Sequence, residues 1–255
     1  MTDKKRLRIF AGPNGSGKTT LYYHLVNKKA FNDYCFINAD EITEKLKKSL
    51  DLTEFMVKFS MDDFFAFLNK SPFVKKLTKP LAEYLNAQGY VLTLKNKKSK
   101  EIAYISASIA EFLRKKILSS SNSSFAFETV LSHKSKLKEI HKAREYGYKV
   151  YLYIIFTSHP FINIKRVQMR KKMGGHSVPL KKIQERYYRS LDNIFEAMLL
   201  ADKVFFFDNS GKKNYYSFIA QKENDELALV NDFLPYWFNK YILEKIWNCK
   251  GNLSI

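Results

Sequence analysis

Short apolar runs alternate along this chain with segments in which apolar side chains recur at helical spacing. The apolar runs predict strands at residues 7–11, 34–39, 124–129, 149–157 and 203–209. All but the second are almost continuously apolar, as in strands buried on both faces of a parallel sheet. The residues between them predict helices. Strands that alternate with helices predict an α/β fold, in which right-handed βαβ units form a parallel sheet flanked by helices.

Residues 41–123 connect the second and third predicted strands, and this stretch is too long for an ordinary crossover. Its pattern is helical in EITEKLKKSL, FVKKLTKPLAEYLNAQ and IAEFLRKKIL, whereas GYVLTLKN suits a short strand or a hairpin arm. We therefore expect a helical insertion between strands 2 and 3 that serves as a substrate subdomain.

Residues 211–255 are predicted to form a helical C-terminal extension. Trp237, Trp247 and their apolar neighbours suit an amphipathic helix that packs on the core. A partner-binding surface is the alternative.

The chain is strongly basic, with 44 Lys and Arg against 25 Asp and Glu and a formal net charge of +19. This charge attracts polyanions and anionic small molecules. Lysine is scattered rather than concentrated in one block, which favours a solvated basic surface over a dedicated nucleic-acid face. Cys35 and Cys249 lack the spacing of a zinc site or a disulfide framework, and no segment is apolar enough to span a membrane. We therefore expect a cytoplasmic protein without a membrane partner.

Residues 12–19, GPNGSGKT, match the phosphate-binding pattern GxxxxGK[ST]. A predicted strand precedes them and a predicted helix follows, which is the context that this loop requires. Glycines let backbone N–H groups turn toward a phosphate, Lys18 reaches the terminal phosphates, and the Thr19 hydroxyl can bind Mg²⁺. The predicted nucleotide-binding residues are Gly12, Pro13, Asn14, Gly15, Ser16, Gly17, Lys18, Thr19 and Thr20. The sequence thus predicts a purine nucleotide with Mg²⁺.

Other motifs decide which class of P-loop protein is expected. An ABC transporter ATPase requires an LSGGQ-like signature, which the chain lacks, and a GTPase requires an NKxD motif, which is not found where it is needed. A kinase requires a general base, an acidic group for the metal and a mobile basic lid. The chain offers candidates for all three.

The candidate base is Asp40, in NADEI, where the second predicted strand ends. A carboxylate at the carboxyl edge of the sheet can bind the acceptor and take its hydroxyl proton. The alternative is that Asp40 caps the helix that follows it.

The candidate metal-directed acid is Glu128, in FAFET, where the third predicted strand ends. An acid so close to a buried strand is costly unless it is paired or faces a metal. Glu128 and Thr129 are also predicted to contact the substrate. A helix cap is the alternative for this segment, and Ser132 or Thr129 suits that role better than Glu128.

The candidate lid is NIKRVQMRKKMGGHSVP, residues 163–179. Arg166 and Arg170 are four apart and share one helix face, and paired glycines follow as a hinge. Guanidinium groups there can neutralise a transferring phosphoryl group. For Lys171 and Lys172 we favour a solvated face. His176 suits either a phosphate contact or a turn before Pro179.

In this order, these clusters resemble the zeta toxin family, in particular the branch labelled predicted ABC-type ATPase. The matching segments include AGPNGSGKTT, FINADEI, FAFETVLSHKSKL, NIKRVQMR, GGHSVPLKKIQERYYRSLDNI and ADKVFFFDNS. They cover most of residues 7–210. The length of 255 residues suits one globular unit, which we expect to be a single P-loop kinase domain over residues 1–255. The resemblance implies the P-loop kinase fold, a toxin–antitoxin role with an antitoxin partner, and phosphorylation of a sugar hydroxyl of UDP-N-acetylglucosamine.

Carried over by position, Lys18 and Thr19 would hold ATP and Mg²⁺, Asp40 would be the base, and Glu128 would place the substrate or metal. Arg170 would be a lid arginine. The family's second lid arginine falls where this chain has GGHSVP, which leaves Arg166 or His176 as the substitute, or a different chemistry.

The leading hypothesis is an ATP-dependent kinase that transfers the γ-phosphate to a hydroxyl of a small substrate. The net charge keeps open a nucleic-acid-associated P-loop NTPase or polynucleotide kinase. A third hypothesis is a nucleotide-binding module that regulates a partner without turnover.

Overall fold

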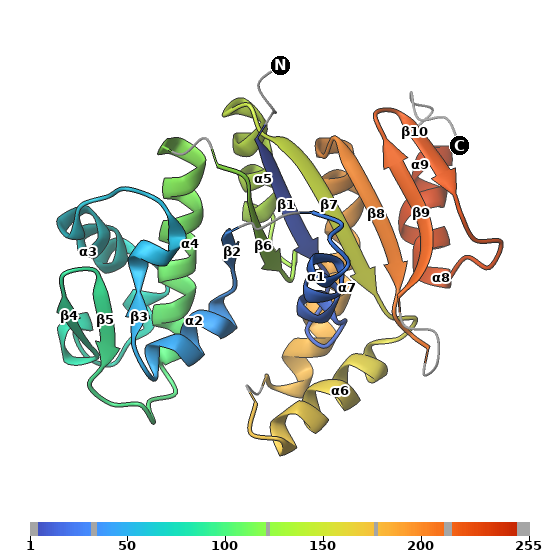
Figure 1. Cartoon of the computed structure of the whole chain (residues 1–255). Helices are drawn as coiled ribbons and strands as arrows, with labels where there is room; N and C mark the ends of the chain where they lie inside the picture. Colours follow the sequence, from blue (N-terminus) through green and yellow to red (C-terminus); the bar gives the residue numbers. More distant parts are fainter. Residues whose placement is uncertain (1–4, 32–34, 121–122, 176–177, 212–215, 249–255) are drawn as a thin grey trace. The chain divides into compact units, whose positions relative to one another are not determined.

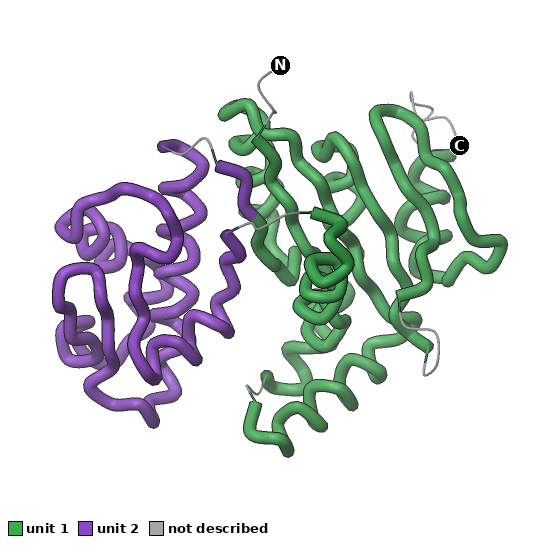
Figure 2. The backbone as a smooth tube through the Cα atoms, viewed as in Figure 1, with its two compact units in different colours: residues 1–34, 126–255 green, residues 35–125 purple. Residues whose placement is uncertain are grey.

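The computed structural model describes residues 5–31, 35–120, 123–175, 178–211 and 216–248. The described chain forms two compact units. Residues 1–34 and 126–255 make up the first, and residues 35–125 the second (Figure 2). Each unit has its own sheet and helices.

The first unit is built on a mostly parallel sheet in which the strand order is β10-β9-β8-β7-β1-β6 (Figure 1). Its strands are β1 (Arg6–Ala11), β6 (Phe125–Thr129), β7 (Lys149–Phe156), β8 (Lys203–Asp208), β9 (Ser217–Glu223) and β10 (Glu226–Leu229). Strand β7 pairs in parallel with both β1 and β8, in the register Ala11↔Ile154 and Phe156↔Asp208. These strands therefore end together at one edge of the sheet.

Helices cover both faces of this sheet. They are α1 (Lys18–Asn27), α5 (Ser135–Glu145), α6 (Pro160–Lys172), α7 (Leu180–Leu200), α8 (Tyr236–Phe238), the π-helical turn η4 (Asn239–Leu243) and α9 (Glu244–Asn248). On one face, Phe10 packs edge-on against Tyr22 of α1. On the other, Phe156 contacts Tyr187 of α7 and Trp237 of α8. The predicted α/β fold, with a mostly parallel sheet flanked by helices, is confirmed.

The predicted strands are all present, at nearly the predicted bounds. The apolar runs work as predictors here because strands between two helical layers bury both faces. The four phenylalanines Phe10, Phe127, Phe156 and Phe206 are at most 1% exposed. Each such burial contributes about 1.5–3 kcal/mol.

The C-terminal extension is only partly helical, so the prediction for 211–255 is wrong in its first part. Residues 217–229 form the antiparallel hairpin β9–β10, and β9 pairs with β8. The pair Glu223↔Glu226 leaves Asn224 and Asp225 as a two-residue turn, with Asn224 at φ 52. Asn is one of the residues that accept this left-handed conformation in hairpin turns. The sequence therefore contains a turn signal for this hairpin at Asn224.

The second unit combines helices with a small antiparallel sheet in which the strand order is β3-β5-β4. Its elements are β2 (Cys35–Ile37), α2 (Ala39–Leu46), β3 (Leu50–Asp51), η1 (Leu52–Phe55), α3 (Met61–Lys70), η2 (Val74–Lys76), η3 (Leu81–Glu83), β4 (Leu85–Gln88), β5 (Val91–Leu94) and α4 (Ile102–Ser120). Rings of Phe59, Phe64 and Phe112 pack together in its core, with centroids 4.9–5.9 Å apart.

The insertion is therefore not purely helical. The predicted helix at 73–88 is instead two short 3₁₀ turns followed by β4, which pairs with β5. Pro80 explains the difference, because proline lacks the N–H that a helix interior needs and pushes the preceding residue out of the helical region. The segment GYVLTLKN contains β5, which pairs antiparallel with β4 as one arm of a hairpin, in agreement with the prediction.

Candidate nucleotide site

The phosphate-binding loop lies between the end of β1 and the start of α1, as its pattern predicts. The Gly12 N–H donates to the Thr129 carbonyl oxygen at 3.2 Å, which joins the loop to the end of β6. Helix α1 begins at Lys18, and Lys18 Nζ donates to the Pro13 carbonyl oxygen at 3.2 Å. The lysine side chain thus folds back along the loop toward Pro13 and Asn14. Backbone N–H groups and the positive end of α1 make this an anion-binding arrangement.

Gly17 is confined both by its own backbone and by its neighbours. Its φ is 99°, in the left-handed region that favours glycine. A Cβ at this position would lie 2.5 Å from Asn209 Nδ2 and 2.8 Å from Tyr216 Oη. The loop can follow this path only because residue 17 has no side chain.

Thr19 and Glu128 meet directly. Thr19 Oγ1 donates to Glu128 Oε2 at 2.6 Å, across 109 positions in the sequence. Thr19 comes from the first turn of α1 and Glu128 from the end of β6, and both are half-buried. The structure therefore brings together the two residues predicted to bind the metal. A hydroxyl and a carboxylate are the hard oxygen donors that Mg²⁺ prefers.

Polar side chains that sequence analysis did not identify fix the loop backbone. Asn163 Nδ2 donates to the Asn14 carbonyl oxygen at 2.9 Å, and Asn209 Nδ2 donates to the Ser16 carbonyl oxygen at 2.8 Å. Tyr216 Oη donates to the Gly17 carbonyl oxygen at 2.9 Å.

These bonds turn the loop's carbonyls toward protein donors, so that its N–H groups remain for an anion. Burial is the main cause that raises the pKa of the Tyr216 hydroxyl above its ordinary value.

Arg186 also contacts this loop. Its Nη1 donates to Asn14 Oδ1 at 3.3 Å, from the second turn of α7. Burial lowers the pKa of Arg186, and the nearby Arg189 adds to this effect. The segment ERYYRS drew attention only as part of the family resemblance, and nothing in its local pattern marks Arg186.

Helix α7 holds the other loops at this edge of the sheet. Tyr187 Oη donates to the Thr157 carbonyl oxygen at 2.6 Å, after β7. Ser190 Oγ donates to the Val130 carbonyl oxygen at 2.5 Å, and Asn193 Nδ2 donates to the Leu131 carbonyl oxygen at 2.9 Å. Residues 186, 190 and 193 are spaced three or four apart and share one helix face. One face of α7 thus anchors both the phosphate loop and the loop after β6.

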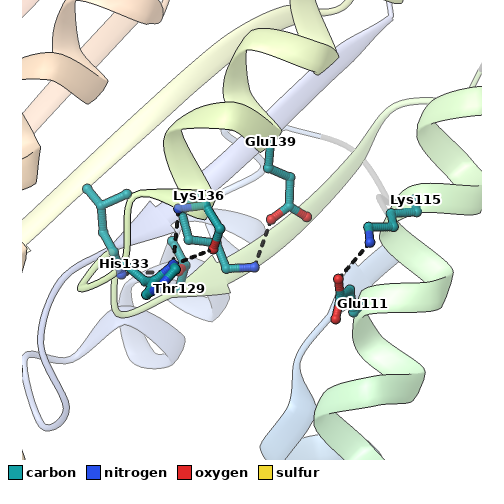
Figure 3. Close-up of polar contacts among 8 residues, drawn as sticks. Glu111, Lys115, Thr129, His133, Lys136 and Glu139 are labelled. Carbon is teal, nitrogen blue, oxygen red and sulfur yellow. Dashed lines mark hydrogen bonds and ion pairs between the residues drawn. The ribbon is translucent and has the colours of Figure 1, made fainter. Parts of the chain in front are cut away.

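The loop between β6 and α5 is ordered by its own polar groups (Figure 3). Thr129 Oγ1 accepts from the Leu131 N–H at 3.1 Å, and His133 Nδ1 accepts from the Ser135 N–H at 3.1 Å. Lys136 and Glu139 form an ion pair at 2.8 Å in the first turns of α5. Lys134 is the N-cap residue of α5 and makes no side-chain cap bond, so the helix-cap role considered for Ser132, Thr129 or Glu128 is wrong.

The predicted lid helix is α6, and its C-terminal half carries the expected arginines. Arg166 and Arg170 are half-buried, whereas Lys171 and Lys172 are exposed, in keeping with a solvated face for the lysines. Gly174 has φ 84°, and the Gly175 N–H donates to the Arg170 carbonyl oxygen at 2.9 Å. His176, predicted to bind substrate, lies outside the described residues.

Asp40 lies in the second unit, in the first turn of α2. Its side chain is exposed, and its N–H donates to Asn38 Oδ1 at 2.8 Å. Asn38 is therefore the cap of this helix, and the capping role considered for Asp40 is wrong.

Comparisons with known proteins place this fold. A scan against protein-family models and a search of curated proteins both return no match. Among solved structures, the AvrRxo1-ORF1:AvrRxo1-ORF2 complex with ATP matches with a TM-score of 0.57 and 17% identity. The match covers 100% of this chain and 67% of that chain. The same complex with sulphate ions matches with a TM-score of 0.56 and 16% identity, at the same coverage.

This chain has the AvrRxo1 fold. A structure from the PezAT chromosomal toxin–antitoxin system of the human pathogen Streptococcus pneumoniae also matches, at 14% identity, over 82% of this chain and 68% of that chain. Its TM-score is 0.48. Among the described residues, none of the helices of this AvrRxo1-like chain is both long and apolar enough to cross a bilayer.

Proposed function

We propose that this protein is an ATP-dependent phosphotransferase of the zeta toxin type that requires Mg²⁺. The observation that carries the proposal is the 2.6 Å hydrogen bond between Thr19 and Glu128, beside a phosphate-binding loop. A loop hydroxyl next to an acid at the end of a neighbouring strand is the metal-binding pair of P-loop NTPases. The likeness to a structure solved with ATP supports ATP as the nucleotide.

The proposed roles follow from the chemistry of each side chain. Lys18 and the loop N–H groups would bind the β- and γ-phosphates, and Thr19 and Glu128 would hold the metal. A bound Mg²⁺ supplies charge neutralisation on the transferring phosphoryl group. Asp40 would take the proton of the acceptor hydroxyl, and Arg170, with Arg166, would stabilise the transition state.

For the acceptor we propose a small hydroxyl-bearing molecule, with Glu128 and Thr129 as its candidate contacts in the first unit. The resemblance to zeta toxins makes UDP-N-acetylglucosamine the first compound to test. The matching structures contain two gene products, ORF1 and ORF2. This supports, by analogy, an antitoxin-like partner for this chain.

A magnesium titration of ATP binding tests the Thr19–Glu128 pair. We expect Glu128→Gln and Thr19→Val to weaken the Mg²⁺-dependent part of ATP binding by about tenfold or more, since each removes a metal ligand or its partner. Thr19→Ser keeps the hydroxyl and is the matched control, with affinity close to that of the wild type. Equal ATP binding with Mg²⁺ and with EDTA in the wild type would contradict the proposal.

A further inference from the structure

Arg186 is fixed at the phosphate-binding loop by a single hydrogen bond. Its Nη1 donates to Asn14 Oδ1 at 3.3 Å, and the Asn14 carbonyl oxygen is held in turn by Asn163 at 2.9 Å. Arg186 of α7 and Asn163 of α6 thus both donate hydrogen bonds to Asn14 of the loop. Asn14 follows Pro13, whose carbonyl oxygen accepts from Lys18 Nζ. Since the P-loop lysine reaches the β- and γ-phosphates, Arg186 lies at the terminal-phosphate end of the loop.

The charge of Arg186 is poorly balanced by the chain. Its side chain is half-buried, its only hydrogen-bond acceptor among the described residues is a neutral amide oxygen, and no described carboxylate forms an ion pair with it. A second cation, Arg189, lies close enough to lower the pKa of Arg186 further. A partly desolvated cation beside another cation is unfavourable unless an anion compensates it.

The geometry of the guanidinium suits a phosphate. Arginine carries five N–H donors in a planar fork and stays protonated in proteins. One of these donors is used by Asn14. The remaining donors can bind phosphate oxygens in pairs.

We propose that Arg186 binds the terminal phosphate of the nucleotide and is a further arginine of the site, beside Arg166 and Arg170. The inference rests on the proposed function, because it requires a nucleoside triphosphate in the loop. Arg166 and His176 are the substitutes considered from sequence, whereas Arg186 is identified by its hydrogen bond to the loop itself. The competing explanation is that Arg186 only positions Asn14.

Calorimetric titration with ATP and with ADP, both with Mg²⁺, separates these explanations. We expect Arg186→Gln to weaken ATP binding about 10- to 100-fold, the loss of a hydrogen-bonded charge, while ADP binding changes less than about threefold. Arg186→Lys keeps the charge without the fork and is expected to fall between the two. Lys182→Gln, an exposed change one turn earlier on α7, is the control and leaves both affinities unchanged.

Asn14→Ala supplies the decisive comparison. If Arg186 contacts phosphate, Arg186→Gln costs more ATP affinity than Asn14→Ala does. If Arg186→Gln costs no more than Asn14→Ala, or weakens ATP and ADP equally, the proposal is overturned. Arg186→Lys gives the same comparison should Arg186→Gln fail to fold, as judged by its circular dichroism.

Failure of the proposed function can be distinguished from failure of the role proposed for Arg186. A wild-type protein that binds no ATP, or a Lys18→Ala variant that binds it as tightly as the wild type, removes the proposed function and this inference with it. Normal ATP binding and turnover combined with a silent Arg186→Gln variant removes only the role of Arg186.

Discussion

At the scale of single residues, the site is defined by close contacts that the loop motif alone does not specify. Gly17 is enclosed by Asn209 and Tyr216, whose side chains come from the segment after β8. Tyr216 itself adopts a left-handed φ of 58°, which costs free energy for a residue with a side chain. In this strained conformation the Tyr216 hydroxyl donates to the Gly17 carbonyl oxygen. The protein therefore makes this contact at some cost in folding free energy.

Gly17→Ala tests this enclosure. The added methyl group would clash with Asn209 and Tyr216 and would strain the backbone, so we expect ATP affinity to fall at least tenfold by calorimetry. Gly147→Ala is the matched control, because Gly147 also has a positive φ of 78° but no other group lies within 4 Å of the place its methyl group would take. The control loses stability, by roughly 1–2 kcal/mol, and keeps its ATP affinity. Equal affinities for the two variants would show that the enclosure does not matter.

The identities of the site residues were predictable from sequence only where they are local. The loop, Thr19 and Glu128 follow from a motif and from strand ends. Arg186 and Asn14 are 172 positions apart, so their contact depends on how α7 packs across the unit. A basic residue on an amphipathic helix carries no local sign of that packing.

At the scale of elements, the apolar runs predicted the sheet well because its strands are buried on both faces. The hairpin β9–β10 was missed because its strands are mixed in polarity, with Lys222 buried and Glu223 exposed. The helix at 73–88 was overpredicted because its helical spacing continues through Pro80. In both places a local signal determines the structure, the turn at Asn224–Asp225 in the first and Pro80 in the second. The spacing of apolar residues does not.

The C-terminal helix shows which part of an amphipathic pattern contributes to stability. Trp237 is 1% exposed, its Nε1 donates to Asp208 Oδ2 at 2.9 Å, and its ring lies 5.1 Å from that of Phe156. Trp247 is 67% exposed, so the prediction that both tryptophans pack on the core is wrong for Trp247. Phe238, Ile242, Leu243 and Ile246 are also buried, so the segment docks along one face and Trp247 lies on the exposed face.

Urea denaturation of two variants checks this docking. We expect Trp237→Ala to lower the free energy of unfolding by about 3–5 kcal/mol, the cost of removing a fully buried aromatic side chain. Trp247→Ala is expected to change it by less than about 0.5 kcal/mol. Similar losses for the two variants would mean that the C-terminal helix packs differently from the structure.

At the scale of the whole molecule, the proposed roles are distributed over both units. The nucleotide loop, the metal pair and the arginines belong to the first unit, and Asp40 belongs to the second. The net charge of +19 suits an anionic nucleotide and leaves an RNA acceptor as the alternative. The acceptor therefore has to be identified by finding the molecule to which the γ-phosphate of ATP is transferred.

The most direct test follows the γ-phosphate of labelled ATP into small metabolites, inorganic phosphate and RNA. We predict that label enters the small-metabolite fraction when Mg²⁺ and UDP-N-acetylglucosamine or a metabolite extract are present. Asp40→Ala is expected to slow this transfer about 10²- to 10⁴-fold, the contribution of a general base, and Lys18→Ala to abolish it. Glu44→Ala, an exposed change one turn further along α2, is the control and retains the wild-type rate. Label found only in inorganic phosphate or in RNA, or an undiminished rate in Asp40→Ala, would contradict the account.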